Sequence, residues 1–252
     1  MASLKEVKGR IASVNNTRKI TSAMKMVASA KLHKAQAAIE SMLPYERRLH
    51  HILTDYMSNC TEVTSPFIVK REVKKVAVVV FASNTSLCGG FNANVIRHLV
   101  DLLAEYKPLG LENILVFPVG KKVADAVRKL GFRIEGDFQH MADKPSYQEA
   151  ADLAADLMKR FLHGDVDKVE LLYNHFKSTA SQILTRETYL PIDLNNEKKE
   201  EERTIDYILE PSAEELMQEM LPKVLRMKMF TVLLDSNAAE HAARTMAMQI
   251  AS

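Results

Sequence analysis

The chain has 252 residues, of which 47% are hydrophobic and 26% are charged, and its formal net charge is +2. This balance is typical of a globular protein and gives no overall indication of nucleic-acid binding. Two cysteines are too few for a disulfide framework and favour reduced thiols in a cytosolic compartment. No apolar run reaches the length of a membrane-spanning helix, and the N-terminus lacks the apolar core of a signal peptide.

Residues 1–58 are predicted to form one long helix. Apolar residues recur there at coiled-coil spacing in two stripes separated by a polar run: Leu4, Val7, Ile11 and Val14, then Ile20, Met24, Val27, Ala30, Ala35 and Ala38. A helix of this length cannot bury its stripe inside an ordinary domain, so a second long helix must cover it. Residues 1–34 also carry eight lysines and arginines against one acid. Such a face suits an acidic protein surface, an anionic membrane or a phosphate backbone, with a solvated helix face as the alternative.

Residues 74–192 are predicted to form an α/β domain between two helical arms. Apolar, β-branched runs typical of strands buried on both faces of a parallel sheet occur at 76–82, 113–120 and 168–176. Helical segments alternate with them at 93–106, 121–130 and 146–162. Ser146 and Glu149 fit a capping box at the start of the last of these helices. With a short strand at 132–138 and an edge strand at 181–192, the pattern predicts a Rossmann-like domain.

Residues 193–210 form a charged linker of disordered composition, and residues 211–252 are predicted to be the second long helix. Large apolar residues fill its first half, whereas small residues dominate from Ala238 onward and allow close approach to another helix. We therefore expect the terminal helices to pack as an antiparallel coiled coil, with the α/β domain inserted to one side. No helix stop signal precedes Ser252, which predicts a longer natural helix.

The turn Leu87-Cys-Gly-Gly-Phe-Asn92 lies between a strand and a helix, where backbone N–H groups can hold phosphate. It matches neither the dinucleotide fingerprint nor the P-loop, so a tight turn at its two glycines is the favoured interpretation. Cys88 could act as a nucleophile with His98 or His175, but no recognisable motif surrounds it, and a structural thiol is favoured.

Two further groups of charged residues are candidate sites. Asp165, Asp167 and Glu170 form an acidic cluster around a turn, where a solvated loop is favoured because no histidine or cysteine spacing supports a metal. Glu240 and Arg244 lie four residues apart on the second helix, the spacing of a stabilising helical ion pair. Because the surrounding stretch is rich in alanine, contact with an outside partner is the favoured interpretation.

Four segments, in this order along the chain, resemble the γ subunit of F-type ATP synthase: residues 11–31, 87–92, 173–182 and 234–248. The resemblance implies a central, non-catalytic rotor shaft whose coiled coil lies inside a hexamer of alternating α and β subunits. The α/β domain would bind the c-ring together with the ε subunit, so that proton flow turns the shaft and drives the β subunits through ATP synthesis.

The same resemblance implies where the chain meets its partners. It places Met24 and Lys25 on the first helix, and Glu240 and Arg244 on the facing helix, at the contact with the β subunits. It implies no catalytic residue, cofactor or metal in this chain. It also implies a peripheral location on the cytoplasmic face of the bacterial inner membrane, as part of the complex.

The chain departs from that family at two places. Ser83-Asn-Thr-Ser86 replaces the usual Ser-Asp-Arg-Gly, so the turn lacks the family's two charges, and the helical tip that usually follows Met248 is missing. Two alternatives belong to other classes of protein. One is a stand-alone nucleotide-binding enzyme formed by residues 74–192. The other is nucleic-acid binding by the basic arm, which the low net charge and the lack of aromatic stacking residues oppose.

Overall fold

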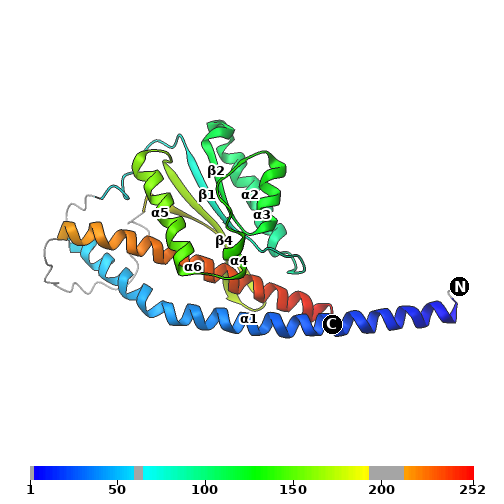
Figure 1. Ribbon diagram of the computed structural model, residues 1–252. Coiled ribbons are helices and arrows are strands. Elements are labelled where there is room, and N and C mark those ends of the chain that lie inside the picture. The colour runs from blue at the N-terminus through cyan, green and yellow to red at the C-terminus, as the bar shows by residue number, and fades with distance from the viewer. Residues whose placement is uncertain (1–2, 60–64, 193–212) are drawn as a thin grey trace.

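The computed structural model describes residues 3–59, 65–192 and 213–252. Two long helices, α1 (Leu4–Asn59) and α6 (Ala213–Ile250), run antiparallel along one another, and an α/β domain lies on α6 (Figure 1). The fold class predicted from the sequence is therefore confirmed. The linker predicted at 193–210 lies outside the described residues. Within the described ranges, no helix combines the length and apolarity needed to cross a bilayer.

The sheet has five strands in the order β3-β2-β1-β4-β5. Their bounds are β1 Val76–Phe81, β2 Ile114–Val119, β3 Arg133–Ile134, β4 Lys168–Ser178 and β5 Ser181–Leu190. β1 is parallel to both neighbours, with Val76 opposite Ile114 on one side and Lys168 on the other. β3 is parallel to β2, and the edge strand β5 is antiparallel to β4. The apolar runs thus form a parallel core, as predicted.

Helices cover both faces of this sheet. They are α2 Phe91–Tyr106, α3 Lys121–Leu130, α4 Gln139–Asp143 and α5 Tyr147–His163, with 3-10 turns at Lys107–Leu109 and Leu111–Asn113. Alternate residues of β1 from Val76 to Val80 lie in one core with α2 and α3, and those from Ala77 to Phe81 lie in a second core with α4 and α5. A strand buried on both faces requires an apolar residue at every position, which explains the continuous run.

The capping box predicted at the start of α5 is wrong. Ser146 occupies the N-cap position, but its side chain makes no capping hydrogen bond. Glu149 instead contacts His140, whose Nδ1 lies 3.0 Å from the carboxylate. At the other end of the helix, Gly164 takes a φ of 77° at the C-cap, which agrees with the predicted stop at this glycine.

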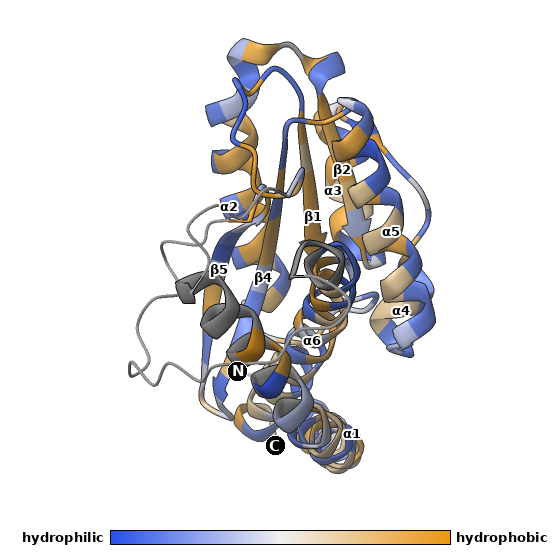
Figure 2. Cartoon of the chain, turned by 90° about the vertical axis from the view of Figure 1, so that its left-hand side faces the viewer, coloured by the Kyte–Doolittle hydropathy of each residue, from blue (hydrophilic) through white to orange (hydrophobic). Residues whose placement is uncertain are grey.

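α6 belongs to the core of the α/β domain as well as to the coiled coil. Leu221, Leu225, Met229 and Leu233 are buried in the same cluster as Phe81 of β1. Viewed from one end of the molecule, α6 lies between the sheet and α1 (Figure 2). The sequence predicted only the coiled-coil role, because the large apolar residues of α6 do not reveal that they also cover one face of the sheet.

The contact face of α1 differs from the predicted one. The buried residues described on α1 are Thr21, Ala28, Leu32 and Ala35. Ile20 and Val27 are 61% and 58% exposed, so the predicted stripe has the wrong phase in this part of the helix, whereas Ala35 of the same stripe is buried as predicted. α6 presents the fully buried Ala238 and Ala242 to this face, and close approach at alanines favours small residues opposite them. Residues 3–20 are exposed throughout and extend past the end of α6 (Figure 1).

Candidate functional site

The turn after β1 lies at the point where the α/β domain meets the last part of α6. Asn92 organises this turn, since its Oδ1 accepts from the Ser83 N–H at 3.0 Å and its Nδ2 donates to Ser83 Oγ at 2.8 Å. Leu87 and Gly89 have φ angles of 68° and 60°. A Cβ placed on Gly89 would lie 3.9 Å from the Cβ of Ala247 on α6. The turn is therefore packed directly against this helix.

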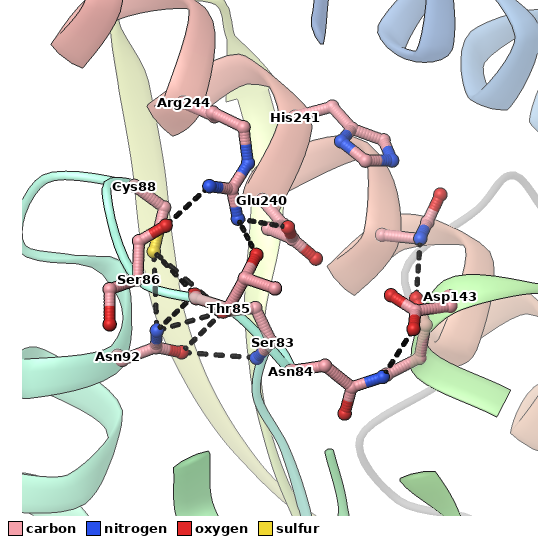
Figure 3. A network of polar contacts seen from close by, with 12 residues as sticks. Ser83, Asn84, Thr85, Ser86, Cys88, Asn92, Asp143, Glu240, His241 and Arg244 are labelled. Atoms are coloured by element: carbon pink, nitrogen blue, oxygen red, sulfur yellow. Dashed lines mark hydrogen bonds and ion pairs between the residues drawn. The ribbon is translucent and has the colours of Figure 1, made fainter. Parts of the chain in front are cut away.

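Arg244 joins α6 to the same turn (Figure 3). Its Nη1 donates to the carbonyl of Ser86, and its Nη2 donates to Thr85 Oγ1 at 2.9 Å and to Glu240 Oε1 at 2.6 Å. The side chains of Arg244 and Glu240 are only 11% and 9% exposed. Burial raises the pKa of Glu240, although the neighbouring guanidinium opposes this effect. The two residues thus form a buried intrachain pair whose cation also binds the domain.

Asn84 stands where the resemblance noted above implies an aspartate, and its side-chain amide is used on both sides. Its Nδ2 donates to the carbonyl of Gln139 at 2.8 Å and to Asp143 Oδ2 at 2.7 Å. Its Oδ1 accepts from the Lys121 N–H at 2.8 Å. An aspartate at position 84 would place a second carboxylate beside that of Asp143, and the two like charges would repel each other. The neutral amide of Asn84 avoids this repulsion and can donate a hydrogen bond to Asp143.

The carboxyl ends of β1 and β4 are the usual ligand position of a doubly wound sheet, because the strand order reverses there. In this chain α6 covers that position. Cys88 and Phe91 pack with Ala239 and Ala243 of α6 in one buried cluster. The cavity between the end of β1 and α6 has a volume of about 10 Å³, which is room for about one water molecule. A nucleotide does not fit this space, so the geometry favours the tight-turn interpretation of the glycines.

The surroundings of Cys88 support a structural thiol. It is 1% exposed, and its Sγ lies 3.2 Å from Asn92 Nδ2. His175 is engaged elsewhere, with its Nδ1 2.6 Å from Asp235 Oδ2, and His98 is exposed on α2. The structure therefore brings neither histidine to the thiol as a base.

The three residues of the predicted acidic cluster have different surroundings. Asp167 Oδ2 accepts from the backbone N–H groups of Lys74 and Lys75, each at 3.0 Å. Glu170 is 2% exposed, so the solvated-loop interpretation is wrong for this residue. Burial alone would raise its pKa, but hydrogen bonds from Lys168 and Arg186 outweigh that effect and lower it. In the described ranges, no group of three or more His, Cys, Asp or Glu could hold a metal ion.

Met24 and Lys25 lie on α1 beside the last turns of α6. Both are partly exposed, and Lys25 Nζ donates to Gln249 Oε1. One turn earlier, Thr21 Oγ1 donates to the carbonyl of Ala251 at 3.3 Å. The structure thus places Met24 and Lys25 beside the last turn of α6, whereas Glu240 and Arg244 lie at the α/β domain.

Sequence reasoning missed the second polar connection between α6 and the domain. Asp235 Oδ1 accepts from the Phe176 N–H at 2.8 Å, and Asp235 Oδ2 contacts His175. Asn237 Nδ2 donates to the carbonyl of Ala142 at 2.9 Å. Asp235 and Asn237 are polar residues between an apolar and an alanine-rich stretch, and this interruption is the feature that could have identified them.

Sequence comparisons relate this chain to one family, the ATP synthase gamma chains. Residues 3–252 match the family model described as ATP synthase. The ATP synthase gamma chain of Phocaeicola vulgatus is 80% identical over 254 residues, which cover 100% of this chain and 88% of that one. The gamma chain of Bacteroides thetaiotaomicron is 60% identical over 263 residues, with coverages of 100% and 88%.

Solved structures share the fold at lower identity. The central stalk and c-ring structure of the Tetrahymena thermophila mitochondrial ATP synthase contains a chain with a TM-score of 0.63 and 22% identity, covering 92% of this chain and 99% of that one. A chain in the rotor of the Euglena gracilis mitochondrial ATP synthase has a TM-score of 0.60 and 18% identity, with coverages of 96% and 88%. At these identities the likeness concerns the fold.

Proposed function

This chain belongs to the ATP synthase gamma chain family, and we propose that it turns as the central shaft of that complex, coupling ion-driven rotation to ATP synthesis and hydrolysis. It is a stalk subunit and not the catalytic subunit. The observation that carries the proposal is a helix of 56 residues, about 84 Å long, paired with a helix of 38 residues that is also built into the α/β domain. A rod with one laterally attached domain is a geometry suited to transmitting torque.

The partners we propose are the α and β subunits around the coiled coil, and the ε subunit and c-ring at the α/β domain. The charge of the N-terminal part of α1 supports the contact with the α and β subunits. Its exposed bases are Lys5, Lys8, Arg10, Arg18 and Lys19. A basic helix attracts acidic loops on surrounding subunits, and this attraction does not require one fixed contact geometry. Such contacts suit a surface that must move past several partners in turn. The location we propose is the cytoplasmic face of the bacterial inner membrane.

Met24 and Lys25 are the residues we propose for direct contact with β subunits. Both are partly exposed and lie beside the last turn of α6. For Glu240 and Arg244 we propose a different role, because their side chains are about nine-tenths buried and bonded within the chain. They would affect the partner contact by holding α6 in position, not by touching a β subunit.

The test is ATP hydrolysis by purified α and β subunits from the same source, with and without this chain, together with size-exclusion chromatography of the mixture. We expect co-elution and stimulated turnover, with no hydrolysis by the chain alone. Absence of co-elution at every salt concentration would overturn the proposal. The alternative, a nucleotide-binding enzyme, is tested by titrating the whole chain with nucleotide. Because α6 fills the space at the carboxyl ends of β1 and β4, we expect no specific nucleotide binding at that position.

A further inference from the structure

The α/β domain is attached to α6 by a row of polar contacts in addition to its apolar core. Within the described residues they occur at five places along the helix: Tyr189 Oη donates to the Leu225 carbonyl, Lys228 Nζ lies 3.2 Å from Glu187 Oε2, Asp235 contacts His175 and Phe176, Asn237 donates to the Ala142 carbonyl, and Arg244 donates to Ser86 and Thr85. From residue 225 to residue 244 these contacts span about 28 Å of helix. The attachment therefore extends along α6 instead of lying at one point.

The contact at Asp235 is directional. Its two carboxylate oxygens bind two different groups of β4, the Phe176 N–H at 2.8 Å and His175 Nδ1 at 2.6 Å. The side chain is 15% exposed, so water screens it little. Charge-assisted hydrogen bonds of this kind are shorter and stronger than neutral ones, and two of them fix the carboxylate in one orientation.

The contact at Arg244 is also directional and binds a different part of the domain. The planar guanidinium donates to the Ser86 carbonyl and to Thr85 Oγ1 in the turn after β1. It lies nine residues beyond Asp235, which is about 13 Å along the helix axis. One anchor would allow the domain to pivot about it, whereas two separated anchors on different strand ends oppose rotation about α6 as well as sliding along it.

The coiled-coil contact has a different character. In its middle part, α1 meets α6 through Leu32 and Ala35, which pack against Ala238 and Ala242. Beside the last turn of α6, Thr21 and Lys25 add hydrogen bonds to Ala251 and Gln249. Apolar packing holds surfaces together but is not directional, so by itself it opposes slippage weakly. Of the two long helices, α6 contributes most of the buried residues that pack with the α/β domain, so torque applied to the domain passes mainly through α6, and the polar anchors are directional contacts on that path.

We propose that Asp235 and Arg244 are positioning residues that lock the α/β domain to the shaft against rotation, so that torque reaches the coiled coil without slip. This inference rests on the proposed shaft function. The readout is the amount of ion pumped for each ATP hydrolysed by the assembled complex in membrane vesicles. A residue that only stabilises the fold would change the amount of active complex but leave that ratio unchanged.

The first test combines Asp235→Ala with Arg244→Lys. Lysine retains a cation beside the buried Glu240 but cannot reproduce the fork that reaches both Ser86 and Thr85. We expect hydrolysis to be retained and ATP-driven pumping to fall. Lys223→Ala is the matched control, because it breaks a surface pair with Glu219 on the same helix without touching the domain. An unchanged pumping ratio in the double variant would overturn the proposal.

A second test replaces the lost polar contacts by a disulfide between α6 and the turn after β1, and asks whether this bond restores coupling. The expected Cβ separation of 3.9 Å between position 89 and Ala247 falls in the range for a disulfide. Gly89→Cys and Ala247→Cys, added to the double variant, should restore the pumping ratio when oxidised and lose it again when reduced. Comparing the two redox states of one protein cancels any strain from a side chain at the positive φ of position 89. A variant with Ala247→Cys alone reports any bond to Cys88.

The outcomes separate this inference from the proposed function. If the unmodified chain neither joins the complex nor stimulates hydrolysis, the shaft function itself fails. If the unmodified chain couples normally and oxidation does not rescue the double variant although the crosslink forms, the anchor inference is wrong. Restoration of the ratio by oxidation supports it, provided that the reduced protein is fully folded at the assay temperature, because the disulfide itself also raises stability.

Discussion

Glu240 and Arg244 form an ion pair of 2.6 Å in which neither side chain is more than 11% exposed. Arg244→Ala would leave the carboxylate buried without its cation, so we expect the free energy of unfolding to fall by about 3–5 kcal/mol. Arg244→Lys retains the charge and should cost less. Urea denaturation followed by circular dichroism measures both. Equal, small losses for the two variants would mean that water solvates this carboxylate after all.

His241 should make stability depend on pH. Burial, together with the charges of Lys31 and Arg244, lowers its pKa to about 4 from the ordinary 6.5. Because the unfolded chain then binds more protons between pH 4 and 6.5, stability rises with pH across this window, by at most about 3 kcal/mol. Glu240 acts in the opposite direction, since its raised pKa makes the folded chain bind more protons.

We therefore expect His241→Leu to flatten the rise in stability between pH 4 and 6.5, and Glu240→Gln to steepen it. The measurement is the urea midpoint at several pH values for the three proteins. The charge of Asp143 raises the pKa values of both Glu240 and His241, so Asp143 is kept unchanged in all three proteins. Parallel curves for the unmodified chain and His241→Leu would contradict the assignment.

The strands and helices could be predicted because their burial dictates the sequence pattern locally. The segment at 76–82 is apolar at every position, which a strand between two layers requires. The contact face of α1 could not be predicted in the same way. Exposed Ile20 and Val27 have the same spacing as a buried stripe, and hydropathy does not tell which side of a long helix its neighbour covers.

The candidate site was predictable only in part. The spacing of Glu240 and Arg244 allowed a pair on one helix face, although contact with an outside partner was the favoured interpretation. The other contacts of Arg244 lie 158 positions away at Ser86. Sequence spacing carries no information about such a contact. Asp235 was missed for the same reason, since its partners on β4 come next to it only after the sheet has packed on α6.

Tyr189→Phe tests the contribution of one buried hydrogen bond between β5 and α6. The hydroxyl donates to the Leu225 carbonyl at 2.7 Å, and the side chain is 4% exposed. Its removal should lower the free energy of unfolding by about 1 kcal/mol. Thermal denaturation checks this, with the 44% exposed Tyr147 as the site of a matched Tyr147→Phe control. An equal shift for both variants would show that the buried bond contributes nothing specific.

Met24→Lys tests the proposed contact with β subunits. The substitution adds a second cation beside Lys25 on a partly exposed face, so we expect coupling to suffer more than folding. ATP-driven pumping relative to hydrolysis, together with the melting temperature of the isolated chain, measures the two effects. Met26→Lys adds the same charge at a 66% exposed position on another face of α1. Collapse of thermal stability with normal coupling in the remaining folded chain would make Met24 a core residue.

Ala238→Leu tests whether close approach of the two long helices depends on small residues. Ala238 is fully buried and packs with Leu32 and Ala35 of α1. Three additional carbon atoms at this position would force α1 away from α6, at a cost of about 1–3 kcal/mol. Ala30→Leu adds the same atoms at an exposed position of α1 and should leave stability nearly unchanged. Because Ala238 lies outside the buried cluster that joins α6 to β1, we expect hydrogen exchange to increase in α1 and to stay slow in β1. Faster exchange in both elements alike would instead mean that the coiled coil and the domain unfold as one unit.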